Sequence, residues 1–147
     1  MESSRFTKLD KDLSPLPNDA IEWAAVLDNT TNLIWSAGTI GSEPMTHGSA
    51  VKACADLDLC GKTDWRLPTV EELFCLADRS RYNPAIDTDF FRCQSAGYWS
   101  STVDASSPGN VWLVGFGYGH SYWLNQDDEF FVRAVRSAGQ QLALGAL

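Results

Sequence analysis

The strongest local signal in this chain is Asp64–Ser80, which reads DWRLPTVEELFCLADRS. Thr69 is a good N-cap residue, and Glu72 follows three positions later, which is the spacing of a capping box. Pro68 stands directly before the cap and discourages the helix from extending backward. Apolar side chains recur through the segment at helical spacing, namely Val70, Leu73, Phe74, Leu76 and Ala77. The pattern predicts an amphipathic helix that begins after Thr69 and ends near residues 79–81.

Upstream of this helix, Ile21–Ser36 has the pattern of two strands around a turn. The apolar runs Trp23–Leu27 and Leu33–Trp35 flank DNTTN, whose Asp and Asn residues favour turns. A second short helix is expected around Ser49–Leu57, where apolar residues share one face at helical spacing. Residues 1–20 are polar and contain two prolines, so they are expected to form an irregular or extended lead-in.

The C-terminal third of the chain is β-prone, because YWSST, VWLVGF and FFVRAVR follow one another between Gly, Ser, Asn and Asp residues. Nine of the 17 aromatic residues lie between Tyr98 and Phe131, which predicts that this region holds much of the core. Alternation fails within VWLVGF, which favours a strand covered on both faces. We therefore expect a lead-in over 1–20, a single α+β domain over 21–137 and a C-terminal tail over 138–147.

Charge and hydropathy exclude several classes of partner. The net charge is -8, and no Lys or Arg lies between Arg92 and Arg133, so nucleic-acid binding through that region is not expected. No apolar run approaches the roughly 18 residues of a membrane span. The N-terminus carries charges where a signal peptide has an apolar stretch, so we expect a protein that is cytoplasmic at synthesis.

The cysteines do not predict a metal site. Cys54, Cys60, Cys75 and Cys93 lack the paired C-x-x-C spacing of structural zinc sites. Reduced thiols are expected in a cytosolic protein. A disulfide is the alternative, and Cys54 with Cys60 would be the easiest pair because the loop between them is short.

No catalytic residues are predicted. His47 and His120 are the only imidazole bases, and neither stands in a triad or metal motif. The spacing leaves a Cys93–His120 pair open, as it would for any cysteine and histidine in a small domain. No metal and no other cofactor are predicted. Calcium stays open as an alternative, because Asn125, Asp127, Asp128 and Glu129 offer hard oxygen ligands.

The segment Gly115–Glu129, GFGYGHSYWLNQDDE, is the candidate binding surface. Aromatic residues beside Asn, Ser, His and Asp combine rigid contact area with adaptable hydrogen bonding. In an extended chain, four rings from Phe116 to Tyr122 fall on one side. We expect Phe116 to be buried and the rings after it to be more exposed. The alternative is that all of them pack on the core, with glycines allowing close approach. The candidate ligand-binding residues are Tyr118, His120, Tyr122, Trp123, Asn125 and Asp127.

The ordered set DWRLPT, YWSST and VRAVR, together with CGKTDWRLPTVEELFCLAD, resembles the Lcl C-terminal domain family of bacterial and phage proteins. The resemblance covers roughly Arg5 to Arg136. It implies a C-type-lectin-like α+β fold, related to that of formylglycine-generating enzymes, with two helices and a mainly antiparallel twisted sheet. The family has no general catalytic activity, and some members are associated with binding glycans or cell surfaces. The paired reactive cysteines of formylglycine-generating enzymes have no counterpart after Cys93.

Most residues of the matching motifs are expected to be structural. Six apolar ones are predicted core residues: Trp35, Trp65, Leu67, Trp99, Trp112 and Val135. Arg66 and Arg133 are expected to pair with carboxylates or to cap backbone carbonyls, because the guanidinium fork suits such bridges.

The function expected from these observations is non-catalytic recognition of a glycan or protein through residues 117–128. A receptor-binding component assembled into a phage particle is one context. Diversified receptor-binding proteins with lectin-like folds vary in the corresponding region. Six residues here fit changes at adenines of asparagine codons: Tyr118, His120, Ser121, Tyr122, Asn125 and Asp127. The alternative is a structural or assembly protein, either a virion component or an oligomer subunit, with no small-molecule ligand.

Overall fold

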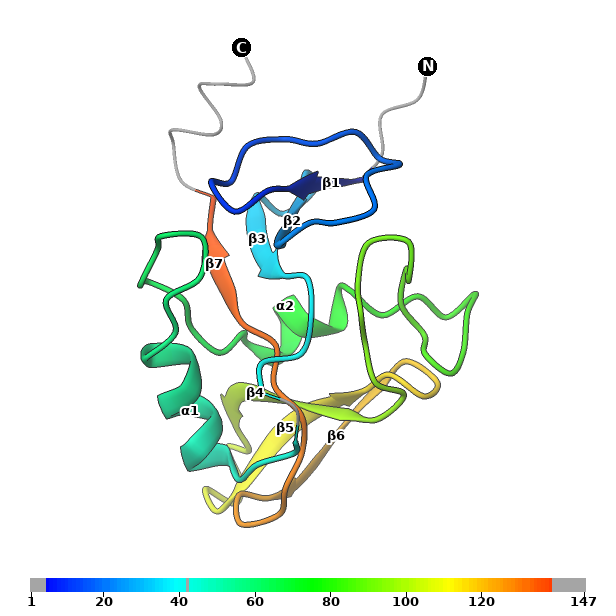
Figure 1. Ribbon diagram of the computed structural model, residues 1–147. Coiled ribbons are helices and arrows are strands. Elements are labelled where there is room, and N and C mark those ends of the chain that lie inside the picture. Colours follow the sequence, from blue (N-terminus) through cyan, green and yellow to red (C-terminus); the bar gives the residue numbers. More distant parts are fainter. Residues whose placement is uncertain (1–4, 42, 139–147) are drawn as a thin grey trace.

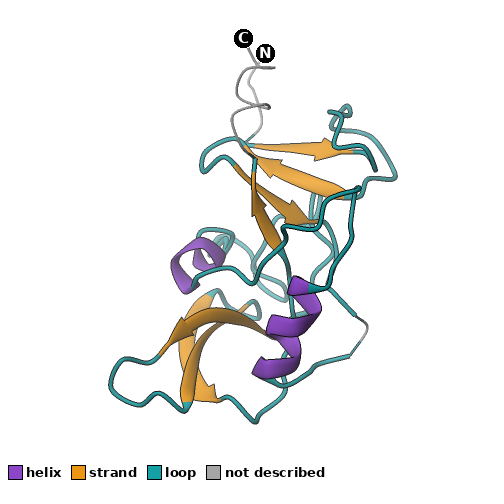
Figure 2. Ribbon diagram, turned by 90° about the vertical axis from the view of Figure 1, so that its left-hand side faces the viewer, coloured by secondary structure: helices purple, strands orange, loops and turns teal. Residues whose placement is uncertain are grey.

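The computed structural model describes residues 5–41 and 43–138. It contains two separate antiparallel sheets, with two helices beside and between them (Figures 1 and 2). The strands and helices are β1 (Phe6–Leu9), β2 (Ala25–Asp28), β3 (Leu33–Ser36), α1 (His47–Ala55), α2 (Val70–Phe74), β4 (Gly97–Val103), β5 (Asn110–Gly115), β6 (His120–Asn125) and β7 (Val135–Ser137). The expected α+β class with two helices is confirmed, but the single sheet expected from the sequence is divided into two.

The four-stranded sheet has the order β1-β2-β3-β7 and contains the first and the last of the described strands (Figure 1). The hairpin of β2 and β3 confirms the predicted turn, in which Asn32 adopts a positive φ of 59° that Asn tolerates better than most residues. The strand β7 pairs with β3, placing Val135 opposite Trp35. Residues 6–9, within the expected irregular or extended lead-in, form the strand β1. Phe6 packs on Phe90 and Phe91, which gives this polar segment an apolar anchor.

The three-stranded sheet has the order β4-β5-β6. Its two faces pack against different helices. Trp99 and Leu113 lie opposite one another and belong to the core cluster that includes Ala50 and Cys54 of α1. Their neighbours Tyr98 and Val114 belong instead to the cluster of Leu73 in α2. We call these the α1 face and the α2 face. The central strand β5 is therefore covered on both faces along its last three residues, as its sequence predicted.

The helix α2 begins as predicted but ends early. Both bonds of the capping box between Thr69 and Glu72 are present, and Arg66 donates two hydrogen bonds of 2.8 Å to the Glu72 carboxylate. After Phe74 the N–H groups of Leu76 and Ala77 bond to carbonyls three residues earlier, as in a 3₁₀ turn. The Asp78 N–H then bonds to the Ala85 carbonyl, which lies outside the helix, at 2.7 Å. This pairing pulls the chain out of the helical path before residues 79–81.

Arg133 links the two sheets from inside the core. Its guanidinium is fully buried and donates to the carbonyls of Ser36 (2.7 Å), Ala37 (3.1 Å) and Arg92 (2.6 Å). It also lies over the ring of Tyr98 in β4, 5.5 Å from the centroid. The predicted role as a cap for backbone carbonyls is confirmed.

Five of the six predicted core residues are buried, and Trp112 is not among them. Its ring packs on Trp123 at the surface, with 5.2 Å between centroids. All four cysteines are free, as expected. Burial raises the pKa of Cys54 to about 12, so its thiol stays protonated and unreactive at neutral pH. In the described part of the chain, no helix has the length and apolar character needed to cross a membrane.

Candidate functional site

The predicted binding segment folds as the turn after β5 and the edge strand β6. Gly119 occupies the turn at a φ of 81°, a conformation that L side chains rarely adopt, and its N–H bonds to the Gly115 carbonyl at 2.9 Å. The Arg79 guanidinium donates to the Gly119 carbonyl at 2.9 Å and lies over the Phe74 ring. The turn is thereby fixed to the segment that follows α2.

The turn overturns the expected row of four rings on one side of the chain. Phe116 is fully buried, as predicted, and packs edge-on against Tyr98. Tyr118 lies in the turn itself and is 69% exposed. The extended path needed for strict alternation begins only at His120, because residues 116–119 reverse the chain direction.

Within β6, side chains alternate between the two faces of the sheet. Tyr122 is on the α1 face and is half-buried, with its ring against the Cα positions of Gly97 and Gly115. A Cβ at Gly115 would lie 2.9 Å from that ring, so here glycine does permit close packing. Burial raises the pKa of Tyr122. His120 is exposed on the same face, and its ring centroid lies 5.4 Å from that of Tyr122.

Trp123 lies on the α2 face, opposite Trp112 in the register of β5 and β6. Its side chain is 50% exposed, and the two indole rings pack at 5.2 Å with a 58° tilt. Sequence reasoning placed Trp112 in the core and so missed half of this pair. No local pattern marked its exposure, because alternation fails within VWLVGF, and only the structure shows Val111 and Leu113 buried on the opposite face.

Asn125 and Asp127 lie at the opposite end of β6 from Tyr118. The Asn125 side-chain oxygen accepts the Asp127 N–H at 2.8 Å, and its carbonyl accepts the Asp128 N–H at 3.0 Å. Six strand residues at about 3.3 Å each separate this acidic turn from the β5–β6 turn by about 20 Å. The six predicted residues therefore lie on both faces of one strand and in the turns at its two ends. Among the described residues, no group of three or more His, Cys, Asp or Glu side chains is placed to hold a metal ion.

The two histidines have different surroundings. His47 Nε2 is 3.0 Å from the Ser100 carbonyl, and its ring packs edge-on against Trp99. Burial lowers the pKa of His47. Cys93 packs against the core cluster of the α2 face and donates to the Gln94 carbonyl at 3.3 Å, whereas His120 packs on a tyrosine of the α1 face.

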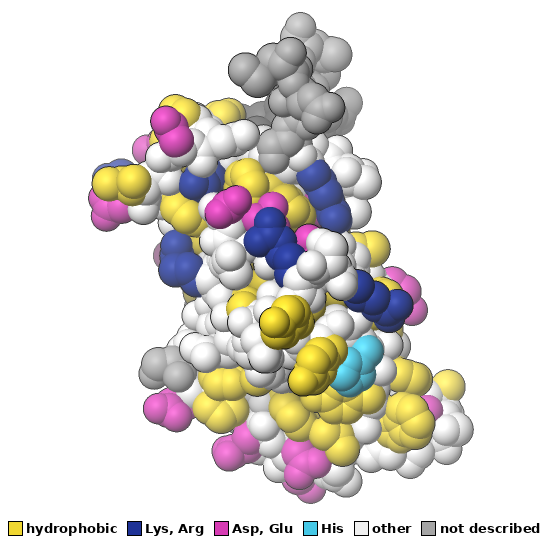
Figure 3. All heavy atoms as spheres, turned by 90° about the vertical axis from the view of Figure 1, so that its right-hand side faces the viewer, with side chains coloured by type: hydrophobic (Ala, Val, Ile, Leu, Met, Phe, Trp, Pro, Cys, Tyr) yellow, Lys and Arg dark blue, Asp and Glu magenta, His cyan; other side chains and the backbone are white. Residues whose placement is uncertain are grey.

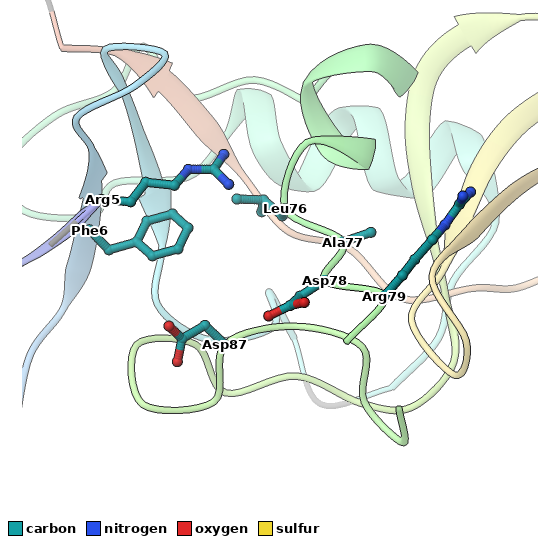
Figure 4. Close-up of a pocket in the computed structure, with 7 residues that line it drawn as sticks. All are labelled: Arg5, Phe6, Leu76, Ala77, Asp78, Arg79 and Asp87. Carbon is teal, nitrogen blue, oxygen red and sulfur yellow. The ribbon is translucent and has the colours of Figure 1, made fainter. Parts of the chain in front are cut away.

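A separate hollow of about 380 Å³ lies between β1 and the segment after α2 (Figure 4), lined by Arg5, Phe6, Leu76, Ala77, Asp78, Arg79 and Asp87. Arg5 is already paired with Asp28 by bonds of 3.1 and 2.7 Å, and Asp78 is paired with Arg81. Figure 4 shows the Arg79 side chain extending away from Arg5 toward the three-stranded sheet. The sequence did not predict this hollow, because it brings together segments about 70 positions apart.

The surface in Figure 3 shows where apolar side chains gather. They cover much of the lower part of this face, at the level of the three-stranded sheet, with one histidine among them and carboxylates along the lower margin. The exposed large apolar residues of the β5–β6 hairpin are Tyr118, Trp123 and Leu124.

A family model described as the Lcl C-terminal domain matches residues 24–136. The match covers both helices and every strand except β1 and the last residue of β7, and it confirms the resemblance seen in the sequence. No curated protein matches the chain.

Proposed function

The chain belongs to the Lcl C-terminal domain family, and on that premise we propose that it is a non-catalytic recognition domain. It binds a glycan or a protein through residues 117–128. The observation that carries this proposal is the half-exposed Trp123, supported from behind by Trp112. The expected C-type-lectin-like fold is part of the same proposal.

The Trp pair has the properties of a contact platform. An indole ring held by a neighbouring ring presents a large flat area and loses little conformational freedom on binding. Ser121 and Asn125 lie two residues either side of Trp123, on the same face of the strand. Hydroxyl and amide groups beside an aromatic ring match a sugar, whose apolar ring face is bordered by hydroxyls, and they also match a polar peptide.

Residues 117–126 contain no Lys, Arg, Asp or Glu, and the carboxylates of the site, Asp127 and Asp128, lie at its far end, so charge attraction is not what would hold a ligand at Trp123. Tyr118 in the turn and His120 on the α1 face are also exposed, but they lie outside the Trp123 platform. A receptor-binding component of a phage particle is one setting for such a domain. A structural or assembly role is the second candidate, and the open edge of β6 favours it.

The test is a binding screen against glycan and cell-surface arrays with the parent chain, followed by Trp123→Ala. We expect at least about a tenfold loss of affinity, because truncating an aromatic anchor typically costs more than about 1.4 kcal/mol. Ile21→Ala is the matched control, since Ile21 is the most exposed large apolar residue and lies outside the hairpin. A ligand whose affinity is unchanged in both Trp123→Ala and Tyr118→Ala would refute the site.

A further inference from the structure

Three of the four sheet edges among the described residues are covered by the chain itself. The outer side of β1 accepts the Leu16 N–H at 2.8 Å, and β7 exchanges two bonds of 2.9 Å with Arg66. The edge of β4 donates to the Pro68 carbonyl at 2.7 Å and also bonds to Phe131. The remaining edge is β6, where five of the six residues are exposed.

Hydrogen bonds within the sheet show which backbone groups of β6 face outward. The Ser100 hydroxyl donates to the Trp112 carbonyl at 2.6 Å, so the backbone groups of Trp112 face β4. Residues directly opposite in an antiparallel pair point their backbone groups either toward each other or away from each other. Trp123 is opposite Trp112, so its N–H and C=O point into solvent. Alternation gives the same outward direction to Ser121 and Asn125, and the Asn125 carbonyl also accepts the Asp128 N–H of the adjoining turn. No bond within the described residues engages the backbone of Ser121 or Trp123.

We propose that this edge pairs with the same edge of a second copy of the chain, antiparallel and in a register centred on Trp123. In that register, Trp123 of one copy lies opposite Trp123 of the other. Ser121 lies opposite Asn125 in both halves, because the two strands are related by a two-fold axis. All three outward-facing residues then meet outward-facing residues, which a shift by two positions would not achieve. The result is one continuous six-stranded sheet.

The character of the strand favours a second copy as the occupant. Exposed edges are normally protected by Lys, Pro or a bulge, and β6 has none of these. Its uncharged residues let two chains of net charge -8 meet where repulsion is weakest. The same register places the acidic turn at Asp127 of one copy beside His120 of the other, which brings opposite charges together when the imidazole is protonated.

The pairing leaves the faces of the sheet open. Trp112 and Trp123 of each copy lie in one row across the α2 face, so a dimer would present four indole rings in line. This arrangement goes beyond the proposed recognition function and does not depend on it. A six-residue strand buries less area than a stable dimer usually needs, so association is expected at micromolar concentrations, about 10 to 100 µM.

Sedimentation velocity on the full chain, from about 5 to about 500 µM, tests the association directly. Amide hydrogen exchange tests the register, because the N–H groups of Ser121 and Trp123 have no partner in the monomer. We expect their protection to rise at least about tenfold at high concentration, while amides of β5 stay unchanged.

Two variants test the interface, so that the test still stands if one of them fails to fold. Trp123→Lys places like charges opposite one another, and Ser121→Pro removes an outward N–H that makes no bond within the chain. Both should be monomeric throughout the series. Val103→Lys is the matched control, because Val103 is an exposed apolar residue on the other edge strand, and it should associate like the parent.

A parent chain that stays monomeric at the highest concentration would overturn the proposal. So would a dimer that persists in both β6 variants, or one that forms without new protection at Ser121 and Trp123. If those amides become protected only when an extended peptide of another sequence is added, the edge binds a foreign strand and the second copy is wrong.

Discussion

The two sheets of this protein are treated differently by the chain around them. In the four-stranded sheet, β2 and β3 are almost entirely buried, and both edges are bonded to neighbouring loops. In the three-stranded sheet, β5 is covered on both faces while β6 stays exposed along nearly its whole length. Both edges of the four-stranded sheet are covered, whereas the three-stranded sheet has one covered edge at β4 and one open edge at β6.

This contrast separates residues that stabilise the fold from residues that are free to bind. A side chain in a covered strand contributes burial and hydrogen bonds, so its loss lowers the free energy of unfolding. A side chain on β6 contributes little of either, because solvent already reaches it. Three substitutions test this division, and their expected effects on stability decrease in turn.

Arg133→Ala should have the largest effect. It leaves the Ser36 and Arg92 carbonyls without the guanidinium donor, removes one of the two donors to the Ala37 carbonyl and opens a cavity between the two sheets, so we expect a loss of at least about 3 kcal/mol. Chemical denaturation measures it. Arg136→Ala is the control, because its ion pair with the largely exposed Asp64 should contribute less than about 1 kcal/mol. Equal losses in the two variants would remove the proposed role of Arg133 as the link between sheets.

Arg5→Ala should cost about 2 kcal/mol, because it leaves the buried Asp28 carboxylate without its cation. Burial alone raises the pKa of Asp28, but the hydrogen bonds from Arg5 and Thr30 outweigh it, so the pKa is lowered.

The lowered pKa of Asp28 predicts an acid dependence that can be measured separately. The stabilising contribution is present above the unfolded value of about 3.9 and is lost as pH falls through the lower folded value. The parent chain should therefore lose stability below about pH 4 more steeply than Arg5→Ala does. If the free energy of unfolding of the two chains fell equally between about pH 4 and pH 2, protonation of Asp28 would not be coupled to its ion pair with Arg5.

Leu124→Ala should have the smallest effect, within about 0.5 kcal/mol, because Leu124 lies on the exposed strand. Leu113→Ala is its counterpart in the covered strand and should cost about 3 kcal/mol, since Leu113 is fully buried. Thermal or urea unfolding of both variants gives the comparison. A loss at Leu124 as large as that at Leu113 would mean that β6 is part of the core.

Local patterns predicted much of this fold. The capping box of α2, the β2–β3 hairpin and the covering of β5 all follow from residues close together in the sequence, and the structure confirms them. The early end of α2 was not predictable, because it depends on a bond from Asp78 to the Ala85 carbonyl, which the folding of the following loop brings back to it. Residues 6–9 were expected only as part of an irregular or extended lead-in and not as the strand β1, because the apolar partners of Phe6 lie more than 80 positions away.

The candidate site shows the same division. Composition alone marked residues 117–128 as an exposed segment rich in aromatic and polar groups. Only the tertiary structure separated its residues, placing Tyr122 against Gly115 on one face and Trp123 against Trp112 on the other. Periodicity gives the alternation of a strand, but which face is covered depends on the elements that pack there. The open edge likewise depends on where distant loops happen to pair, and this decided that β6 alone among the described edges remains free.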